Sequence, residues 1–514
     1  AALLALADVI LSVDQVQQYM DTDRHRWHVD SELNTGVAFF RASAGALAVL
    51  DDWREAMAKA IAKGNPNHDQ YWLNQVLAPR KLVNLKLDDA ARAAWLPPTL
   101  EAMRRRDPSR VGLPASSAEL GGAQPDLRAL FLFETKRFGA ALEQVTLATL
   151  PIAEVSNGHT FFVQKLHDIV GVPPVCVHTT YQYGDATAYA YGKRERLRDA
   201  HLWLLDTPQS HWSGRFLQLS TAPARLLGPR SSELLLPSVI DPDHCVRSHL
   251  KLIMLQRQWL MDGFLLAKAL RRTLVLPPVW CMLDKFWTIL DHCLIGSKVE
   301  MPQPFVCPLD HSFSLGRMVA AGLEWREHSF LTNPLAPPDL LASRARLHVG
   351  DAAAGGASTG SELRVDGGTA GSGAGAGVRV RSGATFAELV ADVEASPAAT
   401  SARVLEIDAE ALGTLCRCTR GMSPELVSMS RRLPSLLESD FHYCDTTDNP
   451  YFVECKKHGR QGCRKHRTYL MNVSKGMSTP PVVPSEGCGA GKGCAPYWLP
   501  TSHITEGVIG ATSK

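Results

Sequence analysis

The order of hydrophobic and polar residues predicts alternating strands and helices near the start of the chain. Residues 3–14 form an apolar run with a polar end, which is typical of a buried strand. In residues 33–41 the turn-forming sequence Asn-Thr-Gly leads into Val and Phe positions, so a second strand is expected. Apolar side chains recur at helical spacing in residues 43–63, and residues 69–77 begin with aspartate, a good helix cap. The pattern therefore predicts an α/β layer.

A second α/β unit is predicted in residues 241–414. Its first part combines a strongly helical segment, residues 249–270, with a short apolar strand, residues 274–278. Helix, turn and strand in this order form the repeating unit of an α/β layer. We therefore assign residues 1–240 to a first domain and residues 241–414 to a second.

The second unit is interrupted, but not ended, by residues 350–383. This segment is rich in Gly, Ala and Ser and has few large apolar groups, which predicts a disordered insertion. Helical spacing returns in residues 386–393, and residues 403–407 have the pattern of a strand. Residues 415–514 are Cys-rich with little periodicity, so an irregular C-terminal region is expected.

Length and composition are typical of a globular protein with two or three domains. The chain has 514 residues, of which 45% are hydrophobic and 21% are charged. A net charge of only +2 argues against nucleic acid as the main partner. No apolar run is long enough to cross a bilayer, and the apolar start lacks the basic region of a signal peptide. Because the sequence begins without Met inside an expected strand, we expect a fragment, and any targeting or membrane-anchor segment would lie upstream.

Cysteine usage favours an oxidising compartment. Seven of the twelve cysteines lie beyond residue 410, where disulfides are therefore expected. Asn472 begins a glycosylation acceptor triplet, which is compatible with a secretory route. Two Cys-x-x-His pairs in this region also have zinc-like spacing, but the short gap between the pairs favours disulfides. The residues of this cluster are Cys444, Cys455, His458, Cys463 and His466.

Candidate chemistry is concentrated in residues 158–199. A short apolar strand ends at His178, and an imidazole at a strand end can bind a metal ion. The loop that follows leads to Gly192 and Lys193, with Arg196 behind them. Glycine lets the backbone approach a phosphate and lysine supplies positive charge, so this loop is a candidate diphosphate site. A structural histidine and a solvated basic loop explain the same residues equally well.

Two further polar groups precede this segment. Asn34, Thr35 and Gly36 have the composition of an ordinary turn before a strand. Asp69 and Gln70 start a predicted helix, and another amide follows one turn later. Asp69 can be a helix cap alone. Alternatively, its carboxylate can stabilise positive charge on a sugar while the amides bind sugar hydroxyls.

Several unusual strings occur in one order along the chain. They are NTG (34–36) with FFR (39–41), DQ (69–70), GHTFFVQ (158–164), VHTTYQYG (177–184) and GKRERLRDA (192–200). The second unit adds LVLPPVWC (274–281), FVCPLDH (305–311) and REHSFL (326–331). In these strings the chain resembles plant and algal nucleotide-diphospho-sugar transferases, and above all the extensin arabinosyltransferase type. The likeness covers most of residues 1–340.

The resemblance implies an α/β fold of the GT-A type and a Golgi membrane enzyme with a lumenal domain. Such an enzyme transfers a sugar with retention from a UDP-sugar donor, using Mn²⁺ (or Mg²⁺). In the arabinosyltransferase group the donor is UDP-arabinofuranose. The glycoprotein acceptor is the arabinose chain on hydroxyproline-rich cell-wall proteins.

Site roles follow from the same resemblance. Asp69 and Gln70 would face the transferred sugar and the acceptor as the catalytic pair, and His178 would be a metal ligand. The donor and its diphosphate would be bound by the remaining motif residues. These are Asn34, Thr35, Gly36, Gly192, Lys193 and Arg196.

The metal motif Asp-x-Asp is expected upstream of this chain. In the family it ends a strand that precedes the one matched by residues 3–14. Asp21-Thr22-Asp23 has the right form, and carboxylates suit Mn²⁺ or Mg²⁺, but it lies too late and no apolar strand precedes it.

Three alternatives stay open from the sequence. A related transferase could use UDP-galactose or UDP-xylose, since no residue decides between pentose and hexose. A non-catalytic lumenal scaffold with a degenerate transferase layer is also compatible with the pattern. A second transferase domain in residues 241–414 is disfavoured, because this unit has no phosphate-cradling glycine loop.

Overall fold

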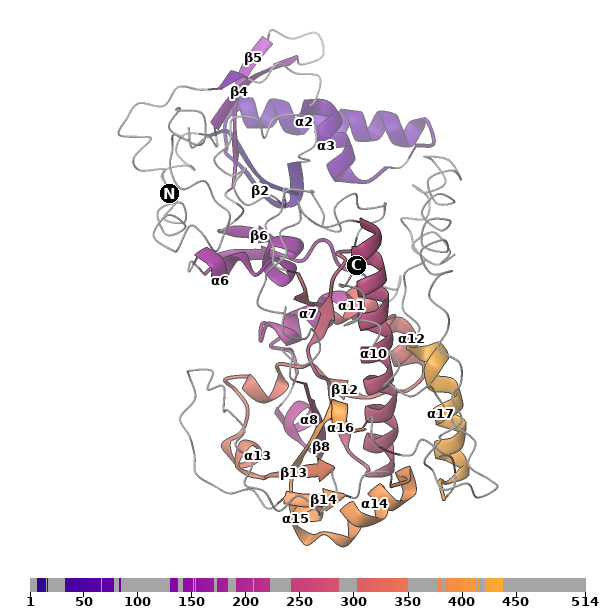
Figure 1. Cartoon of the computed structure of the whole chain (residues 1–514). Helices are drawn as coiled ribbons and strands as arrows, with labels where there is room; N and C mark the ends of the chain where they lie inside the picture. Colours follow the sequence, from indigo (N-terminus) through magenta and orange to yellow (C-terminus); the bar gives the residue numbers. More distant parts are fainter. Residues whose placement is uncertain are drawn as a thin grey trace. The chain divides into compact units, whose positions relative to one another are not determined.

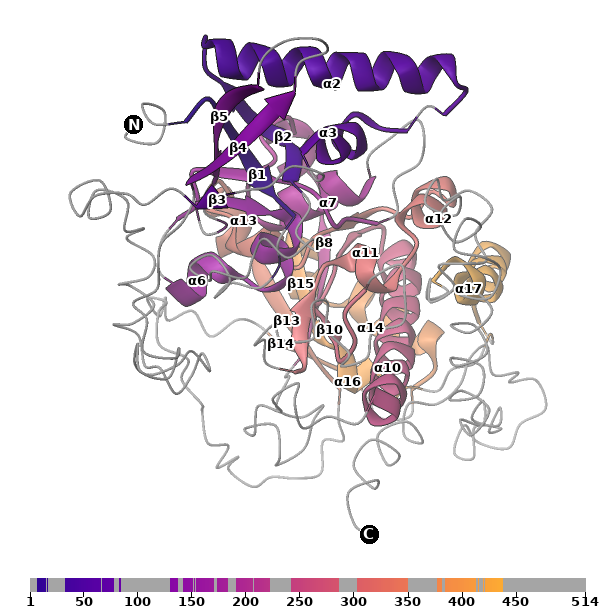
Figure 2. The same ribbon diagram turned by 90° about the horizontal axis from the view of Figure 1, so that it is seen from above.

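The structure is a computed structural model of the whole chain, shown in Figure 1 and, turned by 90°, in Figure 2. The residues that it describes are 7–14, 16, 33–65, 67–77, 83–84, 130–136, 142–150, 152, 154–170, 173–183, 191–206, 208–221, 242–285, 303–349, 377–380, 384–412, 415, 419 and 421–437. The Asp21-Thr22-Asp23 triplet, the Cys/His cluster of residues 444–466 and the triplet at Asn472 lie outside these residues.

The chain divides into two compact units. Unit 1 comprises Ala1–Gln182 with two short segments from later in the chain, Leu236–Ser238 and Leu294–Pro302. Unit 2 comprises Tyr183–Leu235, Val239–Cys293 and Gln303–Lys514. This division differs from the predicted boundary at residue 240. The chain enters unit 2 earlier because the strand at residues 216–220 pairs with strands of that unit.

Unit 1 is built on a mixed five-stranded sheet in the order β2-β1-β5-β4-β3. The predicted first strand is β1 (Val9–Val13), and all five of its residues are buried. It pairs antiparallel with β2 (Leu33–Phe40), which contains the Asn-Thr-Gly sequence, and parallel with β5 (Leu142–Thr149). On the other side of β5 follow β4 (Leu130–Lys136) and the edge strand β3 (Val83–Asn84).

Two predicted helices cover this sheet, α2 (Ala44–Ala62) and α3 (Asp69–Leu77). The Ser43 side chain caps α2 by accepting a hydrogen bond from the backbone of Ala46, which satisfies one of the free N–H groups of the first turn. Buried apolar residues of both helices form one cluster with the sheet. Its members include Val9, Leu11, Val13, Val49, Leu73, Leu77, Val145 and Leu147.

A further described part of unit 1, the π-helical subdomain (residues 154–178), carries the string GHTFFVQ. Two short parallel strands, β6 (Val155–Asn157) and β7 (Cys176–His178), flank a π-helical turn, His159–Val163, and helix α6 (Leu166–Val170). The predicted strand that delivers His178 to its end is thus present as β7. All residues of the π-helical turn are buried, so this string is a core element of the subdomain.

Unit 2 contains a six-stranded sheet in the order β12-β9-β8-β15-β13-β14. Every neighbouring pair in it is parallel. Its strands are β8 (Phe216–Ser220), β9 (Thr273–Val275), β12 (Trp325–Arg326), β13 (Arg344–Val349), β14 (Gly377–Val380) and β15 (Val404–Asp408). Strands β13 and β15 lie on either side of residues 350–383 in this one sheet, as expected for an insertion within a single α/β unit. The prediction of disorder is wrong for Gly377–Val380, which lie within these residues and form β14.

Helices surround this sheet. The longest, α10 (Pro242–Ala269), contains the predicted helix at residues 249–270 and runs beside the sheet in Figure 1. Close packing depends on Gly263, because an added methyl group there would overlap the side chain of Leu219 on β8. The other helices are α7 (Tyr191–Asp199), α8 (Pro208–Trp212), α11 (Leu309–Ser312), α12 (Leu315–Ala320), the 3-10 turn η6 (Phe330–Thr332), α13 (Pro338–Ala342), α14 (Phe386–Ala395), α15 (Pro397–Ser401), α16 (Ala409–Leu412) and α17 (Pro424–Leu436).

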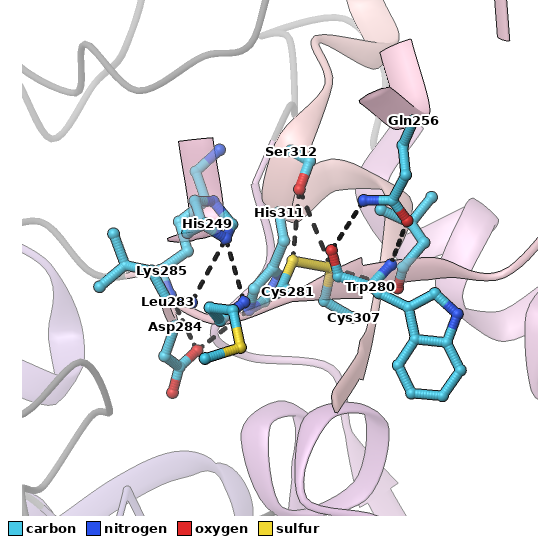
Figure 3. Close-up of a disulfide and its surroundings, with 12 residues drawn as sticks. His249, Gln256, Trp280, Cys281, Leu283, Asp284, Lys285, Cys307, His311 and Ser312 are labelled. Carbon is cyan, nitrogen blue, oxygen red and sulfur yellow. Dashed lines mark hydrogen bonds and ion pairs between the residues drawn. A yellow bond between two sulfur atoms is a disulfide. The ribbon is translucent and has the colours of Figure 1, made fainter. Parts of the chain in front are cut away.

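A disulfide joins the two strands of a small antiparallel hairpin in unit 2, β10 (Val279–Cys281) and β11 (Phe305–Cys307). Figure 3 shows the bond between Cys281 and Cys307, with the Ser312 hydroxyl 3.3 Å from the Cys281 sulfur. The nearby His249 ring accepts hydrogen bonds from two backbone N–H groups. Burial, with the charges of His311 and Lys285, lowers the pKa of His249 to about 3, so this ring is neutral.

Within the described ranges, none of the helices combines the length and the apolar character needed to cross a membrane.

Candidate functional site

The predicted site residues of the first domain come together where β1, β2 and α3 meet. The Thr35 hydroxyl donates a hydrogen bond to the Asp69 carboxylate at 3.2 Å, and the Gln70 side-chain carbonyl accepts one from the Thr35 backbone at 3.4 Å. Asp69 is exposed at the first turn of its helix, and Gln70 is half-buried beside it. The NTG and DQ motifs, which are far apart in sequence, therefore form one cluster.

Asp14 is the centre of this cluster, although no role was predicted for it. Its two carboxylate oxygens accept hydrogen bonds from the side-chain amides of Asn34, at 2.8 Å, and Gln70, at 2.9 Å. The only sequence signal was its place as the polar end of a buried strand. One carboxylate thus fixes an amide from each of the two motifs.

Asn34 and Asn74 shape the backbone of β2. The buried Asn34 side chain accepts a hydrogen bond from the backbone N–H of Gly36 at 2.7 Å. Asn74 makes two hydrogen bonds to the backbone of Leu33, at 3.0 Å and 2.8 Å. The expectation that this second helix amide binds a sugar hydroxyl is wrong in this structure, because Asn74 ties α3 to β2.

His178 lies directly over Gly36. A methyl group added at Gly36 would overlap three atoms of the imidazole ring, so only glycine leaves room for the ring at this place. His178 is half-buried at the end of β7. The predicted metal ligand and the NTG motif are therefore neighbours.

Tyr181 connects the π-helical subdomain to the same cluster. Its hydroxyl donates a 2.7 Å hydrogen bond to the backbone carbonyl of Asp14. The edge of its ring contacts His159, at 5.8 Å between ring centres, and His159 is hydrogen-bonded to Gln164. Gly158 completes the contact, because a side chain there would overlap the Thr180 carbonyl. The segment that carries the string GHTFFVQ is therefore linked to the cluster through Tyr181.

The predicted diphosphate loop is a helix. Gly192 and Lys193 lie in the first turn of α7, which belongs to unit 2, so the expectation of a flexible glycine loop is wrong. Gly192 is buried in this helix and Lys193 is half-buried. The two residues are therefore placed by helix packing, and not by a turn that wraps around phosphate oxygens.

Arg196 has a structural environment in the interior of unit 2. Its guanidinium Nε lies 3.0 Å and 3.1 Å from the two carboxylate oxygens of Asp310, and both side chains are almost completely buried. Burial alone would raise the pKa of Asp310, but the charges of Arg196 and His311 outweigh it and lower this pKa to about 2. Because its charge is already neutralised inside the protein, we do not retain Arg196 as a phosphate ligand.

The described residues do not form a metal centre by themselves. Among them, no three or more His, Cys, Asp or Glu side chains converge in a way that could hold an ion. His178 supplies one suitable nitrogen, but Mn²⁺ and Mg²⁺ prefer several oxygen ligands. The donor set on the described part of the chain therefore does not fit the expected ion.

The first part of the chain matches a known family. Residues 3–197 fit the model of the nucleotide-diphospho-sugar transferases, a range that includes the whole cluster around Asp14 and reaches into α7. The chain is also 35% identical over 203 residues to a curated relative, Arabinosyltransferase XEG113 of Arabidopsis thaliana. The matched part is 38% of this chain and 29% of that relative, so the chain spans about three tenths of its length. No solved structure matches.

The predicted resemblance to plant nucleotide-diphospho-sugar transferases of the arabinosyltransferase type is thereby confirmed. It agrees with the mixed α/β architecture and with the parallel strands of both units.

Proposed function

We propose that this protein is a glycosyltransferase that moves a sugar from a nucleotide diphosphate to a glycoprotein. The observation that carries the proposal is the cluster of Thr35, Asp69 and Gln70 around Asp14, inside the segment that matches the transferase family. It presents an exposed carboxylate beside an amide and a hydroxyl, which is the chemistry needed to bind and polarise a sugar.

Asp69 is the proposed catalytic carboxylate. Departure of a nucleotide diphosphate leaves positive charge on the sugar ring, and a carboxylate held close to that ring stabilises the charge. Thr35 orients Asp69 by donating a hydrogen bond to one of its oxygens. Gln70 is held through both ends of its amide, so its position is set before any ligand binds.

The choice of donor sugar, stereochemistry and domain type rests on the similarity to the arabinosyltransferase. Transfer of arabinofuranose from UDP-arabinofuranose, with retention and in a GT-A-type domain, is our first choice because the curated relative is an arabinosyltransferase. Hydroxyproline-rich cell-wall glycoproteins are the proposed acceptors. Use of Mn²⁺ or Mg²⁺, with His178 as one ligand, belongs to the same proposal. The same resemblance supports a membrane anchor upstream.

A location in the Golgi lumen belongs to the same proposal. It is supported by the Cys281–Cys307 disulfide, because such bonds form and persist in oxidising compartments and are rare in the cytosol.

The test is donor turnover by the full-length protein with UDP-arabinofuranose, UDP-galactose and UDP-xylose. Removing a group that stabilises the transition state typically lowers kcat by about 10²–10³-fold, so Asp69→Asn should lose that much activity. Asp168→Asn, in the exposed first turn of α6, is the matched control and should keep full activity. Unchanged turnover in Asp69→Asn would show that this residue has another role. Donor binding without turnover in the unaltered protein would favour a scaffold.

A further inference from the structure

One face of the unit 2 sheet changes from apolar to polar along two neighbouring strands. In the parallel ladder between β8 and β15, paired residues project from the same side, and every second residue returns to that side. Following one side from the start of the strands to their ends gives an apolar pair and then two polar pairs. These pairs are Phe216 with Val404, Gln218 with Glu406, and Ser220 with Asp408.

The opposite face has no such change. Leu217 and Leu219 of β8 and Leu405 and Ile407 of β15 are all buried, and Leu219 packs against α10 at Gly263. Strands in the middle of a parallel sheet are normally apolar on both faces, because helices cover both. The polar pairs therefore mark one side of the sheet as different.

An apolar cluster covers the start of the face with the polar pairs. Trp212, Phe330 and Leu340 pack there in one cluster with Phe216 and Val404. The cluster also includes Val275 of β9, which pairs with Gln218, whereas Gln218 and Ser220 are themselves half-buried. The carboxyl-terminal half of the face thus has polar groups where the other half has a core.

Two polar atoms in this region lack a partner. The side-chain carbonyl oxygen of Gln218 and the hydroxyl of Thr221, which directly follows β8, are buried atoms without a hydrogen bond in the described structure. Buried polar atoms in native proteins almost always have a partner. These two atoms are therefore available for hydrogen bonds with a bound molecule.

The position in the fold agrees with a ligand site. From β8 the chain continues to β9 and β12 on one side of the sheet, and it later builds β13, β14 and β15 on the other side. The strand order thus reverses between β8 and β15. In open parallel sheets, ligands bind outside the carboxyl ends of the strands at such a reversal. Gln218, Ser220 and Thr221 lie at that end of β8.

The side chains define the ligand chemistry. An amide, hydroxyl groups and the carboxylates of Glu406 and Asp408 can exchange hydrogen bonds with neighbouring hydroxyl groups on a sugar ring. Arg346 lies 3.9 Å from Glu406 and offsets part of its charge. We infer that the carboxyl-terminal half of this sheet face binds the ring hydroxyls of a sugar, either in an oligosaccharide or in the ribose of a nucleoside.

This inference does not depend on sugar transfer in unit 1, because it concerns binding alone. The experiment uses the full-length protein and calorimetric titration with neutral arabinofuranosyl and xylosyl oligosaccharides, and separately with uridine. Saturation-transfer NMR identifies the ring protons in contact. We expect either the oligosaccharides or uridine to bind. The probe that binds shows whether the recognised sugar ring belongs to an oligosaccharide or to a nucleoside.

Gln218→Leu should weaken this binding by about 2–10-fold, the effect of one lost neutral hydrogen bond, without lowering the melting temperature. Glu406→Gln should weaken it as well, and it serves as the second variant if Gln218→Leu does not fold. Glu425→Gln on the exposed start of α17 is the matched control and should bind normally. The inference is overturned if neither class binds, or if both Gln218→Leu and Glu406→Gln bind as tightly as the unaltered protein.

Discussion

At the scale of single residues, Asp14 determines the arrangement of the proposed transferase site. The site residues Asn34 and Gln70 reach their positions because each amide donates to one oxygen of this carboxylate. Tyr181 in turn holds the backbone of Asp14. Asp14 therefore acts by positioning, and need not contact the donor.

Asp14→Asn should lower both stability and turnover. The substituted amide faces two amide donors, so one hydrogen bond is lost and a buried donor is left without an acceptor, at a cost of about 1–3 kcal/mol in the free energy of unfolding. Misplacing Gln70 and Asn34 by about 1 Å can cost about 10²-fold in kcat/KM. Urea unfolding and donor turnover measure the two effects.

Asp8 offers the matched control for this substitution. Its carboxylate accepts hydrogen bonds from Ser43, at 2.6 Å, and from the backbone and side chain of Thr146 in the same sheet, but it contacts none of the site residues. Asp8→Asn should therefore lose similar stability and keep its turnover wherever it is folded. Equal losses of turnover in both variants would show that Asp14 is only a structural residue.

At the scale of elements, the sequence was sufficient to predict a helix or strand wherever its hydrophobic pattern lies within the element itself. Helix α2 and helix α10 have long stretches with apolar residues at helical spacing, and β1 is a continuous apolar run, so each was predicted close to its observed position. The contacts between NTG and DQ could not be predicted from spacing. They depend on the pairing of β2 with β1 and on the packing of α3, which only the folded chain provides.

Helix α7 shows why the predicted diphosphate loop was wrong. Its sequence, YGKRERLRD, has a single large aliphatic residue, so there is no apolar stripe that would predict a helix. Its buried face is made by Glu195 and Arg196, which are polar, and Arg196 pairs with Asp310, 114 residues away. A helix that is stabilised by distant ionic partners leaves no periodic signal in its own sequence.

The second buried residue of α7, Glu195, should make stability depend on pH. Burial and then the nearby Glu327 raise its pKa to about 8, above its ordinary value of 4.5, although the indole N–H of Trp325 donates a 3.0 Å hydrogen bond to it. Below pH 4.5 the side chain is neutral in both folded and unfolded chains. As pH rises from 4.5 to 8, only the unfolded chain releases the proton, so the stability present at low pH is progressively lost.

Glu195→Gln should remove this loss, because glutamine keeps an oxygen for Trp325 and carries no proton to release. At pH 7 the variant should gain on the order of 3 kcal/mol in unfolding free energy over the unaltered protein, with little difference at pH 4. Melting temperatures across pH 4–8.5 measure the effect, and Glu425→Gln is the control with an exposed carboxylate. Parallel pH profiles for the unaltered protein and Glu195→Gln would contradict the assignment.

At the scale of the whole molecule, each unit has its own apolar core. In unit 1 the core joins β1, β5, α2 and α3, and in unit 2 a separate cluster includes Trp212, Phe216 and Phe330. Proteins with several cores often unfold in more than one step. Calorimetry of the full-length protein should therefore show a transition for each unit. Asp8→Asn should shift the unit 1 transition, and Glu195→Gln should shift the unit 2 transition.

The Cys281–Cys307 disulfide allows a direct test of this independence, because both of its cysteines lie in unit 2. It closes a loop of 26 residues, for which the chain-entropy estimate is about 3–4 kcal/mol. Replacing both cysteines by alanine should therefore lower the melting temperature of the unit 2 transition by several degrees and leave that of unit 1 in place. Cys176→Ala, which removes a free thiol in unit 1, is the matched control and should not move the unit 2 transition. If the double alanine variant moved both transitions by the same amount, the two cores would unfold as one cooperative body, and the disulfide would stabilise the site around Asp14 as well.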